Sequence, residues 1–340
     1  MTRSGLMADR PDSNHPAPRV SVCVATYRRA AQLERLLHHL AEVEPPAGGF
    51  EVVVVDDGSP PADGVSGVLA SAASHFPVPL RWLSLPQNGG RAAARNAAWR
   101  DAMGEWVAFT DDDCRPDPKW LLSLLEAAED VATSRAPAIV QGRVVPDPER
   151  SSLLGSPLAR SLRVESLSEY YQTANILYRR EVLEFVGGFD ESLPGAGEDT
   201  ELGWRVRKGG FSATFAADAV VVHDVVLRSF REDLKDRRRW ADVVRVIKLH
   251  PETRRLAWHP FVYRRSHLGP LLALAGLPLV LAGREPRKAY TTAILLGILY
   301  QLKGARTPRA VLKRVQVLLG DCYEVGVIIR SSARQRTVLL

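Results

Sequence analysis

The sequence has few cysteines, and their positions exclude two classes of protein. Only three occur among 340 residues, at Cys23, Cys114 and Cys322. They are far apart, odd in number and without the spacing of a zinc site, which excludes a disulfide scaffold and a zinc-binding module. We expect three reduced thiols in a cytosolic protein.

Long apolar runs are also lacking. No uncharged apolar stretch reaches about 18 residues, the usual length of a membrane-spanning helix. Residues 1–17 have no apolar core of the kind found in secretory signals, and they are rich in Pro, Ser, Asp and Asn. We expect a disordered leader at residues 1–17 and no secretory signal.

Charge is divided unevenly along the chain. Residues 1–227 carry 22 basic and 31 acidic side chains, whereas residues 228–340 carry 23 and 8. Hydrophobic residues make up 46% of the chain and charged residues 25%, an ordinary globular mixture. The division predicts an acidic globular domain followed by a basic C-terminal region that faces an anionic partner.

Strands and helices are predicted to alternate in the acidic part. β-branched runs predict buried strands at residues 19–26, 50–55, 80–85 and 106–110. Apolar spacing and composition predict helices at residues 33–40, 62–76, 91–103 and 118–128. The alternation predicts an α/β fold with a mostly parallel sheet flanked by helices, whose ligands bind at the carboxyl ends of the strands.

The rest of the acidic part is less regular. We expect strands at residues 139–145 and 174–178, helices at 181–186 and 198–208, and two edge strands at 212–215 and 219–223.

Two acidic clusters directly follow predicted strands. The first, Asp56-Asp57-Gly58, is a weak signal because turns favour Asp and Gly. The second, Asp111-Asp112-Asp113, places three carboxylates side by side, and a divalent cation relieves their repulsion. It predicts a Mg²⁺ or Mn²⁺ site that holds a diphosphate, with a solvated acidic turn as the alternative.

Two other positions each allow two interpretations from the residues alone. Glu198 and Asp199 open a predicted helix, where carboxylates either cap the helix or act as a general base. His223 ends a predicted strand and is either structural or a metal ligand.

Six motifs in this chain resemble, in order and spacing, the family 2 glycosyltransferases, which have the glycosyltransferase A (GT-A) fold. The motifs are VSVCVATYRR, VVVVDDGS, NGGRAAARNAAW, WVAFTDDDC, NILYRREVLEFVGGFDE and GEDTELGWRVRKGG. The resemblance covers residues 18–225 and implies a GT-A catalytic domain over residues 18–227. It also implies a UDP-, GDP- or dTDP-sugar donor and a Mg²⁺ or Mn²⁺ cofactor.

The resemblance implies a role for each matching residue. Those that would line the nucleotide sugar are Thr26, Tyr27, Arg28, Asp56, Asp57, Gly90, Arg91, Asn96, Asp111 and Asp112. Asp113 would bind the metal, with Asp111 on the ribose or metal and His223 completing the metal shell. Asp199, beside Glu198, would be the general base that takes a proton from an acceptor hydroxyl in one inverting displacement. A buried acceptor site would raise the pKa of Asp199 toward the working pH.

One motif departs from the polymer-forming members of the family, which carry Q-x-x-R-W. The similar place here, residues 236–240, keeps the pair Arg239 and Trp240 but lacks the Gln. No multi-helix membrane channel follows it. We therefore expect transfer of one or a few sugars to a lipid-linked or cell-envelope glycan acceptor.

The basic C-terminal region, residues 228–340, is expected to be a helical, membrane-associated extension. Residues 228–248 predict a basic helix, and residues 315–329 a packing helix. Two uncharged segments, 268–282 and 289–302, would be about 22 and 21 Å long as helices, short of a hydrocarbon core of about 30 Å.

Basic residues flank these two segments at both ends, which favours a hairpin that dips into one leaflet of an anionic membrane. The alternatives are a spanning hairpin and a soluble helical subdomain. We expect the chain at the cytoplasmic face of the cell membrane.

Three other functions compete with the transferase. A non-catalytic scaffold that binds nucleotide sugar or glycan has no need of the repulsive triple Asp. A nucleotidyltransferase needs a Gly-rich phosphate loop near the first strand, where residues 25–29 contain no glycine. Nucleic-acid binding is disfavoured because the basic region holds two aliphatic runs and no known binding motif.

Overall fold

The computed structural model describes residues 17–130, 136–272, 274, 288, 291 and 307–340. The chain divides into two compact units. Unit 1 comprises residues up to Ser151 and Ser161–Val225, and unit 2 comprises Ser152–Arg160 and Val226–Leu340. The expected leader and most of the two uncharged segments, 268–282 and 289–302, lie outside the described residues. Within the described ranges, no helix is both long enough and apolar enough to span a bilayer.

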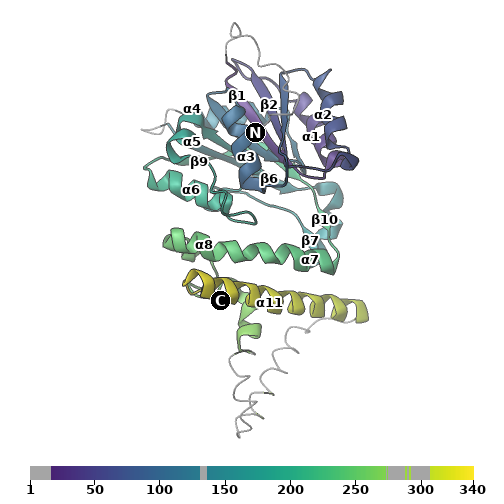
Figure 1. The fold of residues 1–340 in the computed structure, drawn as a ribbon, viewed down its shortest axis with the longest axis vertical. Helices are drawn as coiled ribbons and strands as arrows, with labels where there is room; N and C mark the ends of the chain where they lie inside the picture. The colour runs from purple at the N-terminus through teal and green to yellow at the C-terminus, as the bar shows by residue number, and fades with distance from the viewer. Residues whose placement is uncertain (1–16, 131–135, 273, 275–287, 289–290, 292–306) are drawn as a thin grey trace. The chain divides into compact units, whose positions relative to one another are not determined.

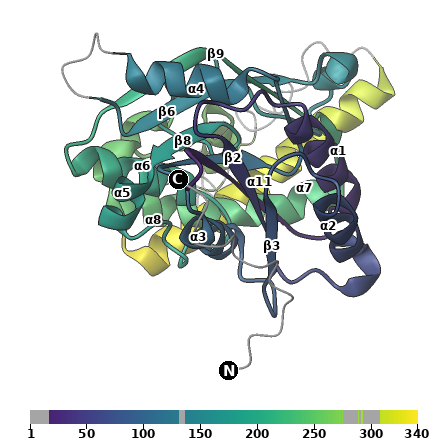
Figure 2. The same cartoon turned by 90° about the horizontal axis from the view of Figure 1, so that it is seen from above.

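An eight-stranded sheet forms the centre of unit 1 (Figures 1 and 2). Its order is β3-β2-β1-β4-β8-β6-β9-β5. The strands are β1 (Val20–Thr26), β2 (Phe50–Asp56), β3 (Leu80–Ser84), β4 (Trp106–Asp111), β5 (Cys114–Pro116), β6 (Ile139–Pro146), β8 (Ile176–Arg179) and β9 (Ala213–His223). The first four are mutually parallel, as is the β6–β9 pair, while β8 and β5 run antiparallel to their neighbours. The prediction of a mostly parallel sheet is confirmed.

Strand β9 corrects one prediction. The two expected edge strands are a single strand of 11 residues, and it lies between β6 and β5 rather than at an edge. The pairing with β6 shifts register between Gly142 and Arg143, so that residues 217–219 bulge. The exposed Ala217 and Asp218 of this bulge interrupt the apolar pattern, which made one strand look like two.

Helices cover both faces of the sheet because its buried strands alternate their side chains between two cores. Val22 and Val24 of β1 pack in one core, with α1 (Ala30–Ala41), α2 (Val65–Ala73) and α4 (Trp120–Glu129). Cys23 faces the other core, with α3 (Arg91–Asp101), α5 (Arg180–Val186) and α6 (Glu198–Lys208). The two-sided coverage is confirmed.

Unit 2 is mainly helical in its described part. Its elements are α7 (Phe230–Arg237), α8 (Ala241–Leu249), α11 (Pro308–Gln335), the short pair β7 (Ala159–Arg160) and β10 (Val226–Leu227), and the 3-10 helices η3 (Arg238–Trp240), η4 (Pro251–Leu256) and η5 (Arg265–His267). The predicted basic helix is confirmed, as α7, η3 and α8 in succession. Helix α11 lies side by side with α7 and α8 (Figure 1).

A buried arginine ties α7 to α11. The Arg237 guanidinium donates to Asp233 at 2.7 Å and to both Asp321 and Glu324 at 2.9 Å. A Cβ at Gly320 would lie 2.7 Å from the guanidinium carbon, so a larger residue there would displace this group from its present position. The two acidic residues within α11 therefore share one cation, which comes from the predicted basic helix.

Candidate active site

Strand ends bring the acidic clusters and His223 to one edge of the unit 1 sheet. Thr26 pairs with Asp56 across β1 and β2, and Ala25 pairs with Asp111 across β1 and β4. The chain then turns into β5, where Cys114 lies opposite His223. This is the carboxyl edge of the parallel strands, where ligands of α/β sheets bind.

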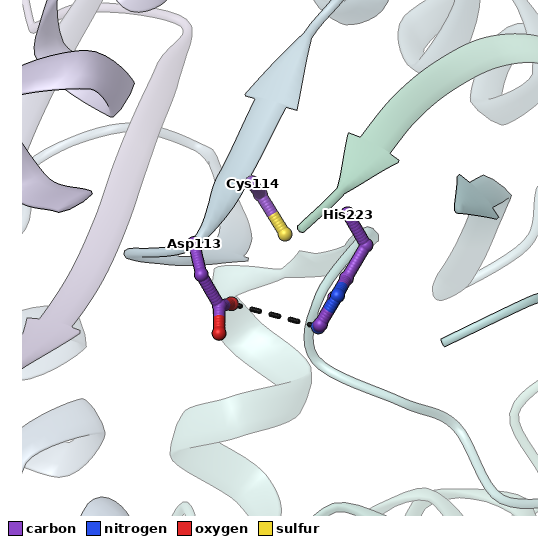
Figure 3. A group of neighbouring side chains, drawn as sticks. All are labelled: Asp113, Cys114 and His223. Atoms are coloured by element: carbon purple, nitrogen blue, oxygen red, sulfur yellow. Dashed lines mark ion pairs between the residues drawn. The ribbon is translucent and has the colours of Figure 1, made fainter. Parts of the chain in front are cut away.

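Asp113 and His223 form a pair suited to a divalent cation (Figure 3). The Asp113 Oδ1 and His223 Nε2 atoms are 3.5 Å apart. His223 Nδ1 lies 2.9 Å from the Asp224 carbonyl, which can only accept a hydrogen bond, so Nδ1 is assigned as a protonated nitrogen. In the neutral tautomer this leaves Nε2, which lies 3.5 Å from Asp113, available as a metal ligand.

Cys114 lies beside this pair but is a poor ligand. Its Sγ and one ligand atom each of Asp113 and His223 lie within 4.8 Å of one another. Burial, followed by the nearby Asp111 and Asp113 charges, raises the pKa of the Cys114 thiol well above its usual value. Sulfur is also a soft ligand that does not suit Mn²⁺ or Mg²⁺, whereas the carboxylate oxygen and the imidazole nitrogen of the pair can bind such an ion.

Arg29 holds the acidic turn in place. Its Nη1 donates to Asp112 Oδ1 at 2.8 Å and to Asp113 Oδ2 at 2.9 Å. Thr26 Oγ1 donates to the other Asp112 oxygen at 2.8 Å. Burial raises the pKa of Asp112 to about 6 even though the Arg29 charge opposes the shift. The structure thus places Asp112 and Thr26, both expected at the nucleotide, in the support of the turn.

Arg95 joins the acidic turn to helix α6. Its two terminal nitrogens donate to Asp111 Oδ1 at 2.8 Å and to Glu198 Oε1 at 2.7 Å. Burial raises the pKa of Asp111, but Arg95 and Arg91 outweigh it and the net pKa is lowered. Asp111 therefore stays ionised. The motif analysis missed Arg29 and Arg95; both lie inside quoted motifs, one residue after Arg28 and four after Arg91.

Asp199 lies in the first turn of α6 with one oxygen engaged. Thr200 donates its backbone N–H to Asp199 Oδ1 at 2.7 Å. The other oxygen has no hydrogen-bond partner in the part of the chain that the structure describes. Burial and the neighbouring Glu198 charge raise the pKa of Asp199 to about 7, which confirms the expected direction of its shift. Such a carboxylate can accept a proton at neutral pH.

Asp57 fixes the turn that begins α3. Its two carboxylate oxygens accept the backbone N–H groups of Gly89 at 2.7 Å and Gly90 at 3.0 Å. Gly90 has a φ of +89°, a conformation that favours glycine. Asp56 accepts the N–H of Ser59 at 3.1 Å. Both aspartates thus shape the loops at this edge of the sheet.

The exposed candidates follow β1 and begin α3. Tyr27 and Arg28 are both exposed, and Arg28 has a φ of +59°. The Arg28 N–H donates to Ser59 Oγ at 2.8 Å, and its guanidinium pairs with Asp63 at 2.8 Å. Arg91 is exposed at the first position of α3.

Three predicted residues have other surroundings. Asn96 is buried and binds the backbone of Phe189 twice, donating to its carbonyl and accepting from its N–H, both at 2.9 Å. Arg239 and Trp240 belong to unit 2, where the guanidinium lies over the indole ring at 5.0 Å.

A mostly parallel sheet with carboxylates at its strand ends and a metal-fitting Asp–His pair defines a GT-A type transferase. The family described as "Glycosyl transferase family 2" matches residues 21–187, and "Glycosyl transferase family group 2" matches residues 106–302. The chain belongs to glycosyltransferase family 2.

Named relatives and a solved structure agree with this assignment. The pre-mycofactocin glycosyltransferase of Mycobacterium tuberculosis is 32% identical over 224 residues, covering 63% of this chain but 44% of the relative. Glycosyltransferase AglE of Haloferax volcanii is 29% identical over 223 residues, covering 64% of this chain and 70% of the relative. This chain thus spans less than half of the first relative.

The mannosyltransferase PcManGT from Pyrobaculum calidifontis, solved with GDP-Man and Mn²⁺, has the same fold. It superposes with a TM-score of 0.62 at 22% identity, covering 96% of this chain and 90% of that one. At this identity the match establishes the fold alone.

Proposed function

We propose that the protein is an inverting, metal-dependent glycosyltransferase. It moves a sugar from a nucleotide-sugar donor to a hydroxyl of a lipid-linked or cell-envelope glycan. One observation carries the proposal. Arg95 links the ionised Asp111 of the acidic turn to the helix that presents Asp199, whose pKa is raised to about 7.

Two sets of residues in unit 1 would carry out the reaction, one holding the metal and the other accepting the proton. A Mg²⁺ or Mn²⁺ ion held by Asp113 and His223, with Asp111 nearby, would neutralise the charge that develops on the leaving diphosphate. Asp199 takes the proton of the attacking hydroxyl through its free oxygen. A single displacement inverts the anomeric configuration and needs no carboxylate nucleophile.

The proposal and the similar PcManGT structure together suggest which nucleotide sugars to test as donors. UDP-, GDP- and dTDP-sugars are all candidates, and the presence of GDP-Man in the PcManGT structure places GDP-mannose among the first to try. Tyr27, Arg28 and Arg91 remain the exposed candidates to line the nucleotide.

The test is release of nucleoside diphosphate from each donor, with Mn²⁺, with Mg²⁺ and with chelator. We expect one donor to be hydrolysed slowly, only with metal, at the same rate by the surface variant Asp218→Asn. A protein that binds a donor tightly yet releases no diphosphate under any metal, with or without lipid, is the non-catalytic scaffold instead.

We further propose that unit 2 holds the protein at the anionic cytoplasmic face of the cell membrane. Trp258 and Phe261 are each 50% exposed on a tight turn, and the Arg254 guanidinium lies 5.4 Å from the centre of the Phe261 ring. His259 and Val262 exchange two backbone hydrogen bonds across this turn, both at 3.0 Å. The Tyr263 N–H donates to the Leu340 carbonyl, and the Leu340 N–H donates to the Phe261 carbonyl, both at 2.7 Å. Exposed aromatics beside cations favour a lipid interface.

Vesicle sedimentation tests the membrane proposal. The variant Trp258→Ser/Phe261→Ser should bind anionic vesicles several-fold less tightly than the wild type. Phe185→Ser, which removes a 70% exposed aromatic from α5 of unit 1, is the matched control and should bind normally. Equal binding by all three proteins would rule out this turn as an anchor.

A further inference from the structure

A cavity in unit 2 that is open to solvent is lined by three exposed arginines that the catalytic proposal does not use. It measures about 550 Å³ and lies among Arg238, Ala241, Asp242, Tyr323, Val327, Arg330, Ser331, Arg334 and Gln335. Its size is within the usual range for small-ligand pockets, about 300–1,000 Å³. Every lining residue comes from η3, α8 or α11, so the cavity is complete within unit 2.

Helical spacing explains why these side chains meet. Tyr323, Val327, Arg330 and Arg334 follow one another at steps of four, three and four, which places them on one face of α11. Arg238 and Asp242 are four apart at the start of the facing helical segment. Ser331 Oγ donates to the Ala241 carbonyl at 2.6 Å and holds the two segments together.

The charges of the cavity are not balanced. Three guanidinium groups face one carboxylate, Asp242, and that carboxylate is engaged by an interaction of its own. Arg238, Arg330 and Arg334 have no carboxylate partner within the described residues. Other arginines of unit 2 are paired: Arg237 with Asp321, and Arg264 with Glu324.

One hydroxyl completes the set of donors. Arg238 Nε donates to Tyr323 Oη at 2.7 Å, which fixes the guanidinium and leaves the phenolic proton free to donate. Forked guanidinium groups and a hydroxyl match the oxygens of phosphate.

We propose that this cavity binds a phosphate or diphosphate group, separately from the donor site of unit 1. The group is carried either by a lipid headgroup or by a soluble phosphorylated compound. The proposal goes beyond the transfer reaction and does not depend on it, because none of the lining residues belongs to the catalytic unit.

The soluble arm of the test is calorimetry with inorganic pyrophosphate on the full chain, in chelator so that no metal-dependent site contributes. The double variant Arg330→Gln/Arg334→Gln should bind roughly tenfold more weakly or worse. The control Lys235→Gln/Lys313→Gln removes the same charge from exposed positions of α7 and α11 outside the cavity, and should change the affinity less than about twofold. Equal weakening in both variants, or no binding by the wild type in either arm, overturns the proposal.

A second, milder variant tests the cavity without the risk that the protein fails to fold. Tyr323→Phe keeps the ring and removes one hydroxyl, and we expect a few-fold loss of pyrophosphate affinity with an unchanged unfolding midpoint. An unchanged affinity in this variant and in the double arginine variant would leave the three arginines as exposed helix charges only.

The lipid arm compares two kinds of vesicle with the same total charge, one containing phosphatidic acid and the other phosphatidylserine. If the phosphate is lipid-borne, phosphatidic acid vesicles bind the wild type more tightly and the double arginine variant loses that preference. If it is soluble, pyrophosphate binding falls in the variant while both vesicle affinities stay equal. Both results support the cavity and differ only in the source of its ligand.

Discussion

Arg95 of unit 1 and Arg237 of unit 2 are buried arginines with different tasks. Arg95 binds Asp111 and Glu198, and its neighbourhood also contains Asp199. The acidic groups there exceed what the cation neutralises, so one of them, Asp199, keeps a raised pKa. Unit 1 thus maintains an uncompensated carboxylate that can do chemistry.

The network around Arg237 is balanced instead. Its three carboxylates meet three cations, because Asp233 also pairs with Arg160 and Glu324 with Arg264. No acidic group is left over, and the network joins α7 to α11. The same residue type therefore pre-organises a site in one unit and fastens helices in the other.

Asp113→Ala should give the largest effect. It removes the carboxylate that faces His223, and we expect metal-dependent turnover to fall by about 10³-fold or more, because metal stabilisation of the leaving group is lost. The rate of donor hydrolysis with Mn²⁺ measures this. Asp218→Ala, also in unit 1 but exposed, should keep the wild-type rate, and a tenfold loss there would show that the effect is not specific.

Asp199→Asn should lower kcat by about 10²–10⁴-fold, the usual contribution of a general base, while donor affinity stays the same. Single-turnover transfer and donor titration separate the two quantities. Normal transfer by this variant would show that Asp199 is not the general base. The proposed difference between the Arg95 and Arg237 networks would then also be wrong.

Arg95→Gln and Arg237→Gln compare the networks directly. Arg95→Gln removes the cation that pairs with Glu198 and Asp111, and Arg237→Gln removes the one that pairs with Asp321, so each should lower the free energy of unfolding by about 3–5 kcal/mol. Urea denaturation measures the stability, and nucleotide titration measures the site. Arg95→Gln should also impair donor binding, whereas Arg237→Gln should spare it where the protein is still folded. If both variants impaired donor binding equally, the claim that only the Arg95 network organises the donor site would be wrong.

The pH dependence should be the mildest effect. Asp199 must be ionised to act, and its pKa is raised to about 7, so kcat should rise about tenfold per pH unit below 7 and level off above it. A rate profile between pH 5 and 9 tests this. If kcat reached half of its maximum near pH 4, the usual pKa of an aspartate, the raised pKa of Asp199 would be contradicted.

Local patterns predicted the sheet and the acidic clusters at its edge. β-branched runs identified β1, β2 and β4, and Asp-rich turns mark the ends of β2 and β4. Arg95 was missed because its partners lie 16 and 103 residues away, and no local pattern encodes such pairs. Strand β5 was missed because three residues carry no periodicity.

Arg237 was missed for a related reason. From sequence alone, the cations of a basic helix are expected to face solvent. Only the packing of α11 against this helix shows that one of them, Arg237, is buried. Besides strand β5 and the continuity of β9, long-range ion pairs are what the sequence did not reveal.

The central claim is that Asp113 and His223 hold the metal on which donor binding depends. Calorimetric titration of UDP, GDP and dTDP into the wild type and Asp113→Ala, each with Mn²⁺ and with chelator, tests it most directly. The account predicts tight binding of one nucleotide by the wild type, only with Mn²⁺, and its loss in Asp113→Ala. Equal affinity with chelator, or in the variant, would contradict it.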